Sequence, residues 1–310
     1  MRKKPTINFI GIGVQKSGTS WLFKNLKKLP DFSLLPIKEL HYFDRHPKYP
    51  FSSTTLYHDS IFKRLRNPDW WFRFRIYFLK NLKKENFSGA KWKLKYFFEK
   101  ANDERYLSFF ENLEGLKGEV TPSYSILDKE DIQEMYRLAP DAKLILLLRN
   151  PIYRAWSQYL HERRKIKGYE TMEIDTEAAI HFMNSKDQIL RSNYERSIEN
   201  YLSVYPKSQL LIGFFDAIAK QPDELMHIVV DFIGGNTAHI SEYLDLKQKF
   251  NVNKKTEMPE EVFEFLKEKY RVPIERLASK YGGYFNIWLE ETYISKCKNN
   301  SPKNPIIEFS

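Results

Sequence analysis

The sequence of 310 residues has a single cysteine, Cys297, and lacks any long apolar stretch. One cysteine excludes an internal disulfide and is compatible with a reducing compartment. No stretch approaches the roughly 20 apolar residues of a membrane-spanning helix. The apolar run after the basic residues 2–4 is broken by Asn8 and by glycines, which is unlike a signal peptide. We therefore expect a soluble cytoplasmic protein. Without a partner cysteine or a histidine cluster, we expect no metal site.

The composition is that of a folded chain with one sizeable core. Hydrophobic residues make up 42% of the sequence and aromatic residues 15%, which excludes a disordered protein. Short apolar runs of strand length, most clearly residues 143–148 and 209–215, alternate with segments of helical spacing, and there is no internal repeat. This alternation predicts an α/β fold with three α/β/α layers and a central parallel sheet. We expect residues 1–310 to form a single domain.

Further helices are expected at residues 70–84, 259–270 and 273–281. The last two are treated as separate helices because each begins with a proline.

The positive charge of the chain is unevenly distributed. Residues 45–100 contain 14 Lys or Arg and 4 Asp or Glu, so they account for the whole net charge of +10. The same segment contains 15 of the 48 aromatic residues. Such a basic, aromatic segment favours an anionic partner, either a glycan, a nucleic acid or a membrane surface.

A glycine-rich stretch follows the first apolar run. Residues 7–12 have the composition of a buried strand, and the glycines that follow allow a sharp turn before a helix at residues 20–28. The candidates for the helix N-cap are Ser17, Thr19 and Ser20. A loop that ends at a helix N-terminus directs unpaired N–H groups toward one point, and Lys16 adds a full positive charge. The stretch therefore predicts phosphate or sulfate binding.

The same stretch is a near miss of the nucleotide-binding loop Gly-x4-Gly-Lys-Ser/Thr. Gly13 and Gly18 have the required spacing, but Thr19 occupies the position of the lysine. The alternative interpretation of the loop on its own is a glycine-rich turn without a ligand.

Four stretches together resemble a known family. They are residues 13–22 (Gly-Val-Gln-Lys-Ser-Gly-Thr-Ser-Trp-Leu), 38–44 (Lys-Glu-Leu-His-Tyr-Phe-Asp), 118–124 (Gly-Glu-Val-Thr-Pro-Ser-Tyr) and 148–157, with Arg149, Arg154 and Ser157. In this order they resemble sulfotransferases that use 3′-phosphoadenylyl sulfate (PAPS), in particular the heparan sulfate-type branch. The resemblance implies a P-loop-like phosphosulfate-binding loop, PAPS as donor, adenosine 3′,5′-bisphosphate as product and no metal.

The resemblance also implies a set of cofactor-binding residues. In the loop these are Gln15, Lys16, Ser17, Gly18, Thr19 and Ser20. Arg149 and Ser157 would hold the 3′-phosphate, for which a planar guanidinium is suited; the alternative for Arg149 is a cap on the sheet. Tyr194 would lie near the nucleotide or serve in packing, and Lys254 is the candidate from a C-terminal cofactor loop.

Catalysis is expected from three side chains. Lys16 would stabilise charge on the leaving phosphate, and the resemblance assigns Glu39 as the base, with His41 in the same cluster. If residues 38–44 form a strand end, Glu39 and His41 point to the same side. The alternative is a surface Lys–Glu pair beside a capping histidine.

The acceptor side is expected to combine two regions of the chain. Its candidates are Lys38, Asp44 and Tyr124 from the motifs, and Arg73 and Arg75 from the basic insertion at about 45–100. The acceptor would be a carbohydrate or a glycolipid-like, amphiphilic molecule, sulfated on a hydroxyl or, as the second candidate, on an amine. Peripheral contact with a membrane surface suits the insertion, and we expect no specific nucleic-acid partner. Val120 stands where the 3-O-sulfotransferases have a lysine. This difference weakens the inference that the chain acts on the same substrate as those enzymes.

Two other functions compete with this interpretation. A P-loop-type small-molecule kinase would require the lysine that Thr19 replaces. A non-catalytic polyanion-binding protein would use residues 45–100 without Lys16, and its binding would weaken steeply with salt.

Overall fold

A six-stranded sheet in the order β2-β3-β1-β4-β5-β6 runs through the structure. The computed structural model describes residues 5–50, 61–77, 87–166, 168, 172–248, 256–294 and 304–309. The strands are β1 (Phe9–Gly13), β2 (Phe32–Leu34), β3 (Leu116–Val120), β4 (Lys143–Leu148), β5 (Leu210–Phe214) and β6 (Ile306–Glu308). Lys254 and Cys297 lie outside the described residues, so the prediction for Lys254 stays open.

All neighbouring strands are parallel except β5 and β6. Strands β1, β4 and β5 are buried almost along their whole length, as expected for a parallel sheet covered on both faces. The prediction of an α/β fold with a central parallel sheet is therefore confirmed. The antiparallel edge strand β6 was not predicted, because three residues are too short a run to be recognised.

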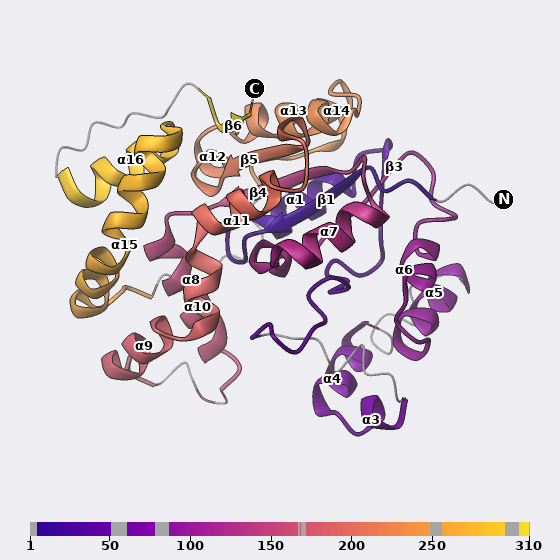
Figure 1. Cartoon of the computed structure of the whole chain (residues 1–310), viewed down its shortest axis with the longest axis horizontal. Helices are drawn as coiled ribbons and strands as arrows, with labels where there is room; N and C mark the ends of the chain where they lie inside the picture. Colours follow the sequence, from indigo (N-terminus) through magenta and orange to yellow (C-terminus); the bar gives the residue numbers. More distant parts are fainter. Residues whose placement is uncertain are drawn as a thin grey trace.

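Helices cover both faces of the sheet (Figure 1). Up to the third strand they are α1 (Thr19–Leu26), α3 (Ile61–Leu65), α4 (Pro68–Tyr77), α5 (Phe87–Phe98) and α6 (Asp103–Ser108). Between β3 and β5 they are η2 (Pro122–Ile126), α7 (Lys129–Leu138), α8 (Pro151–Arg163), α9 (Thr176–Met183), α10 (Lys186–Ser192), α11 (Tyr194–Leu202) and η4 (Lys207–Gln209). After β5 they are α12 (Phe215–Lys220), α13 (Pro222–Ile233), α14 (His239–Tyr243), α15 (Glu260–Tyr281), α16 (Tyr284–Leu289) and the π-helical turn η5 (Glu290–Ile294). Helices α7 and α11 lie in front of the sheet in Figure 1. None of the described helices is both long and apolar enough to span a membrane.

The basic insertion forms a separate group of helices beside the sheet, at the lower right of Figure 1. Trp70 on α4 is fully buried and packs against Phe74 and Phe97. The hydroxyl of Tyr96 on α5 donates to the carbonyl of Leu40 at 3.4 Å, which connects the insertion to residues 38–44. Of the helix expected at 70–84, residues 70–77 belong to α4, and residues 78–84 lie outside the described residues. Pro68 at the start of α4 supplies the fixed φ of a first helical residue.

Two local expectations were wrong. Residues 38–44 are not a strand end, because β2 stops at Leu34 and the chain then turns irregularly. The helices expected at 259–270 and 273–281 form one helix, α15, with Pro273 inside. Proline removes one hydrogen bond there, but Tyr270, Ile274 and Leu277 continue one buried apolar face across the break, and this packing holds the two halves in line.

Candidate functional site

The glycine-rich loop between β1 and α1 has the backbone of an anion-binding turn. Lys16 and Gly18 have positive φ values of 71° and 87°, and Gly18 is the N-cap of α1 without a side-chain cap. The prediction that Ser17, Thr19 or Ser20 caps this helix is therefore wrong. The positive φ favours glycine at position 18, and a Cβ atom there would also lie 2.2 Å from Ile218 Cδ1, so that side chain would have to move. The uncapped N–H groups of the first turn remain available for an anion.

Buried polar atoms surround this turn. Gln15 Oε1 and Ser17 Oγ are buried and have no hydrogen-bond partner among the described residues. Thr19 is also buried, and its hydroxyl accepts from Lys38 Nζ at 3.3 Å, while Ser20 is half-buried in the first turn of α1. Because buried polar atoms are nearly always paired, the two unpartnered oxygens fit a polar ligand seated on the loop.

Several cations converge on the same loop. Burial, together with the charges of Arg164, Arg149 and Lys38, lowers the pKa of Lys16 to about 8. Arg149, at the end of β4, donates from Nη1 to the Lys16 carbonyl at 3.3 Å, and its guanidinium lies 4.4 Å from the centroid of the Phe215 ring. A site with this excess of positive charge suits a ligand that carries several negative charges.

Helix α8 contributes one face to this cluster. Ser157, His161 and Arg164 are spaced i, i+4 and i+7, so they lie on the same side of the helix. Burial and the nearby charge of Lys16 lower the pKa of His161. Of these three residues, only Ser157 was predicted from the sequence. The helical spacing of His161 and Arg164 from Ser157 could have identified them as well.

Two further predicted residues have supporting positions. The hydroxyl of Tyr194 donates to the carbonyl of Arg149 at 2.6 Å, so Tyr194 fixes the end of β4. Arg154 is fully buried and braces α8 against α10 through Gln188 and Ser192.

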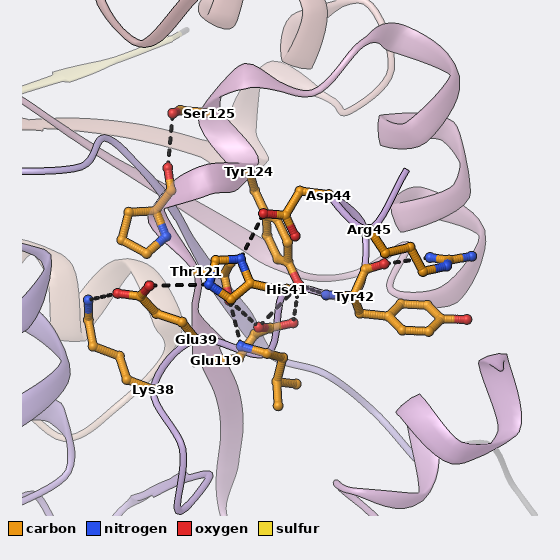
Figure 2. A network of polar contacts seen from close by, with 12 residues as sticks. Lys38, Glu39, His41, Tyr42, Asp44, Arg45, Glu119, Thr121, Tyr124 and Ser125 are labelled. Carbon is orange, nitrogen blue, oxygen red and sulfur yellow. Dashed lines mark hydrogen bonds and ion pairs between the residues drawn. The ribbon is translucent and has the colours of Figure 1, made fainter. Parts of the chain in front are cut away.

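A second cluster lies beside the loop, around Glu39 (Figure 2). Lys38 Nζ is 2.8 Å from Glu39 Oε1, and His41 Nε2 is 3.4 Å from Glu39 Oε2. On the far side of the ring, His41 Nδ1 lies 2.8 Å from Asp44 Oδ2. The Glu39 side chain is 33% exposed, whereas His41 and Asp44 are buried. The cluster therefore presents one accessible carboxylate with two cationic partners.

The ionisation states of Glu39 and His41 follow from their charged neighbours. Burial raises the pKa of Glu39, but Lys38 and His41 outweigh it and hold that pKa well below its usual range. Burial lowers the pKa of His41, but Asp44 and Glu39 outweigh it and raise that pKa to about 9. At neutral pH Glu39 is ionised and His41 is protonated, so Glu39 is the only one of the two that can accept a proton.

A layer of hydroxyl groups beneath the cluster holds residues 38–44 in place. Leu40 N donates to Thr121 Oγ1 at 3.0 Å, and Tyr42 N donates to the Tyr124 hydroxyl at 2.9 Å. Between them, His41 has a positive φ of 56°. These contacts, rather than a strand, bring His41 beside Glu39.

The hydroxyl groups in turn converge on Glu119, which sequence analysis did not select. Glu119 is fully buried and accepts from Thr121 at 2.7 Å and from Tyr106 at 2.7 Å, and Tyr124 lies at 3.3 Å. Burial raises the pKa of Glu119 to about 7. Tyr124 and Asp44, predicted at the acceptor, are buried behind His41 and support the cluster from there.

The two predicted arginines of the insertion lie on different sides of α4. Burial and the charge of Glu39 raise the pKa of Tyr77. The charge of Arg73 partly offsets this rise. Tyr77 therefore lies within range of the charge of Glu39, and Arg73, four residues earlier, shares its side of α4. Tyr77 is a further residue that the sequence did not single out. Arg75 is exposed on the outer side. Among the described residues there is no group of three or more His, Cys, Asp or Glu side chains that could hold a metal ion.

Two curated proteins that are similar to this chain are named as heparan sulfate sulfotransferases. The mouse heparan sulfate glucosamine 3-O-sulfotransferase 3B1 is 29% identical over 126 residues, 38% of this chain and 32% of that protein. The human bifunctional heparan sulfate N-deacetylase/N-sulfotransferase 1 is 24% identical over 310 residues, 90% of this chain and 30% of that protein. The matches thus span about a third of the length of these curated relatives.

The fold and the family are also matched. A solved sulfotransferase from Alicyclobacillus acidocaldarius has a similar fold, with a TM-score of 0.59 and 22% identity over 88% of this chain and 94% of that one. The family model described as the sulfotransferase domain matches residues 7–276. Because that match covers most of the chain, the protein belongs to the sulfotransferase domain family.

Proposed function

We propose that the protein transfers the sulfuryl group of PAPS to a hydroxyl, or as second candidate an amine, of a carbohydrate or amphiphilic acceptor. The observation that carries this proposal is the position of Lys38. Its ammonium contacts both Thr19 at the start of α1 and Glu39, so the anion-binding loop and an ionised carboxylate are adjacent. Transfer between two oxygens needs these two functions side by side.

The residues of the loop fit a donor with two phosphate positions. Lys16, the open N–H groups of α1 and the unpartnered Ser17 Oγ are arranged to bind a 5′-phosphosulfate. By the family resemblance, Arg149 and Ser157 would hold the 3′-phosphate, and two contacts support this role for Arg149: its side chain reaches the loop at the Lys16 carbonyl, and Tyr194 holds its backbone. When bound, PAPS supplies the sulfuryl group and leaves as adenosine 3′,5′-bisphosphate. Lys16 and Lys38 are placed to stabilise the negative charge that develops there.

The Glu39 cluster supplies the acceptor chemistry. Its exposed, ionised carboxylate can take the proton from an attacking hydroxyl, and protonated His41 orients that carboxylate. The names of the mouse and human relatives described above specify heparan sulfate, and the mouse name specifies its glucosamine. We therefore favour a carbohydrate-containing acceptor, without extending the 3-O position to this chain, because Val120 replaces a lysine of that branch.

The competing functions are less well supported. A kinase with a P-loop would need a lysine where Thr19 stands, and Thr19 is buried against Lys38. A protein that only binds polyanions would have no use for an ionised Glu39 next to the loop, because a carboxylate repels such a ligand.

Calorimetric titration with adenosine 3′,5′-bisphosphate and with AMP tests the donor site. We expect binding without metal, and much tighter binding of the bisphosphate, because Arg149 contacts only the 3′-phosphate. Arg149→Ala should remove most of this preference, while the exposed Arg271→Ala on α15 should leave it unchanged. Equal affinity of the wild-type protein for both nucleotides would contradict the proposal.

A further inference from the structure

Helix α4 has two aromatic sides, and only one of them is buried. Trp70 and Phe74 face the interior of the insertion, where they stack on each other. Trp71, Phe72 and Arg75 lie on the opposite side, at the spacing i, i+1 and i+4. Trp71 is 45% exposed and Phe72 65% exposed, so this side presents large apolar groups to the surroundings.

The segment of α3 adds a further exposed ring and a further exposed cation. Phe62 is 73% exposed, and the exposed Arg66 lies four residues further along, one helical turn away. The indole N–H of Trp71 donates to the carbonyl of Leu65 at 2.7 Å, which fastens α4 to α3. We call Phe62, Arg66, Trp71, Phe72 and Arg75 the α3–α4 surface. In Figure 1 these two helices form the outermost part of the insertion, away from the sheet.

The charge of this region has one sign. Residues 61–77 include five Lys or Arg and a single acid, Asp69. Neither Arg66 nor Arg75 forms an ion pair within the described part of the chain. Exposed aromatic rings with adjacent cations are what a protein uses at the boundary of an anionic bilayer, where rings enter the headgroup region and cations meet lipid phosphates. A bilayer would take up the three exposed rings as well as meet the cations, whereas the acidic groups of a soluble polyanion would engage only the cations.

The α3–α4 surface is linked to the Glu39 cluster through the packing of the insertion. Trp70 and Phe74 of α4 pack against Phe97 of α5. The hydroxyl of the neighbouring Tyr96 donates to the carbonyl of Leu40, the residue after Glu39. Lipid that contacts Trp71 and Phe72 would therefore be held against the group of helices that adjoins the Glu39 cluster.

We propose that the α3–α4 surface docks on an anionic lipid bilayer and so presents membrane-embedded, amphiphilic acceptors to Glu39. The docking itself does not depend on the sulfotransferase reaction; the delivery of the acceptor rests on the proposed function.

Co-sedimentation with vesicles tests the docking. The full-length protein is mixed with vesicles of phosphatidylcholine and phosphatidylserine, or of phosphatidylcholine alone, at low and high salt. We expect binding to the mixed vesicles that weakens with salt. The variant Trp71→Ala/Phe72→Ala should bind about tenfold more weakly, because two rings no longer enter the bilayer. Arg66→Ser should bind about fivefold more weakly, the effect expected for one cation near an anionic surface.

Matched variants elsewhere on the surface serve as controls. Tyr243→Ala removes an aromatic side chain that is 45% exposed on α14, and Lys129→Ser removes an exposed cation on α7. Both should bind vesicles like the wild-type protein. All variants should keep wild-type thermal unfolding and wild-type affinity for adenosine 3′,5′-bisphosphate, which separates a failure of docking from a failure of the donor site.

Three results would overturn the proposal. The first is no sedimentation with either type of vesicle, and the second is equal loss in the control variants. The third is that the protein binds a soluble acidic polysaccharide instead of vesicles, with an affinity that falls in Arg66→Ser but not in Trp71→Ala/Phe72→Ala. That pattern would assign the surface to a polyanion.

Discussion

The ammonium group of Lys38 lies 2.8 Å from the carboxylate of Glu39 and 3.3 Å from the hydroxyl of Thr19. One cation therefore touches both the anion-binding loop and the proposed base. In the structure its charge keeps Glu39 ionised but also makes it a weak base. If Lys38 moves toward negative charge that develops at the loop, the basicity of Glu39 rises at the moment when a proton must be accepted.

Replacing the carboxylate tests this role of Glu39. Glu39→Gln keeps the shape and removes the base, so we expect the transfer rate to fall on the order of 10²–10⁴-fold. The affinity for adenosine 3′,5′-bisphosphate should stay close to that of the wild-type protein. Glu264→Gln, which changes a surface carboxylate on α15, is the control and should leave the rate unchanged. A wild-type rate in Glu39→Gln would assign the base to another group.

Donor binding should depend on pH through Lys16. Its pKa is about 8 in the free protein, because it is buried among Arg164, Arg149 and Lys38. Lys16 therefore loses its charge as the pH rises through about 8, and affinity for adenosine 3′,5′-bisphosphate should fall between about pH 7 and pH 9. Calorimetry in two buffers of different ionisation enthalpy should detect proton uptake on binding near pH 8.

Lys16→Met removes the titrating group and is the test of that assignment. Its affinity should already be low at neutral pH and should change little as the pH rises. If the wild-type protein binds equally well from about pH 7 to pH 9, no proton is taken up on binding and the role of the Lys16 charge is contradicted; proton uptake that persists in Lys16→Met would come from another group.

Protein stability should depend on pH through Glu119. Burial raises its pKa from 4.5 to about 7 in the folded state. A raised pKa contributes stability that is complete below pH 4.5 and is lost as the pH rises through about 7. This contribution amounts to about 3 kcal/mol.

Urea unfolding of the wild-type protein and of Glu119→Gln at about pH 5 and pH 8 measures the contribution. The free energy of unfolding of the wild-type protein, relative to the variant, should fall by about 3 kcal/mol between the two pH values. Parallel changes in both proteins would show that Glu119 does not titrate in this range.

Arg73 should matter more for the acceptor than Arg75 does. Arg73 shares the flank of α4 with Tyr77, near Glu39, whereas Arg75 lies on the outer side. With a soluble anionic acceptor, Arg73→Ser should raise KM and make it less sensitive to salt, and Arg75→Ser should have the smaller effect. The affinity for the bisphosphate should not change in either variant. Equal effects of the two variants would place the acceptor away from the inner flank.

Much of the fold was predictable because its signals are local. The apolar run at residues 143–148 is a buried strand whatever surrounds it, and Pro151 after it begins a helix through its own fixed φ. The glycines and Lys16 between the first strand and helix likewise define an anion-binding turn by their own backbone preferences and charge. These features depend on residues that are neighbours in the chain.

Other features depend on residues that the fold brings together from distant positions. Thr121 and Tyr124 hold the amides of Leu40 and Tyr42, about 80 positions earlier in the chain, and thereby set the conformation of His41. No periodicity reveals such contacts. The charge states of Glu39 and His41 follow from partners and burial that exist only in the folded protein.

The sequence by itself determined the fold class, the anion-binding loop and the identity of most residues near it, because propensity and charge act over a few residues. Only the tertiary structure decided the strand order, which side of α4 is exposed and which of two neighbouring ionisable groups can accept a proton. These outcomes are set by burial and by contacts across the chain, and desolvation and long-range pairing have no counterpart in a local sequence pattern.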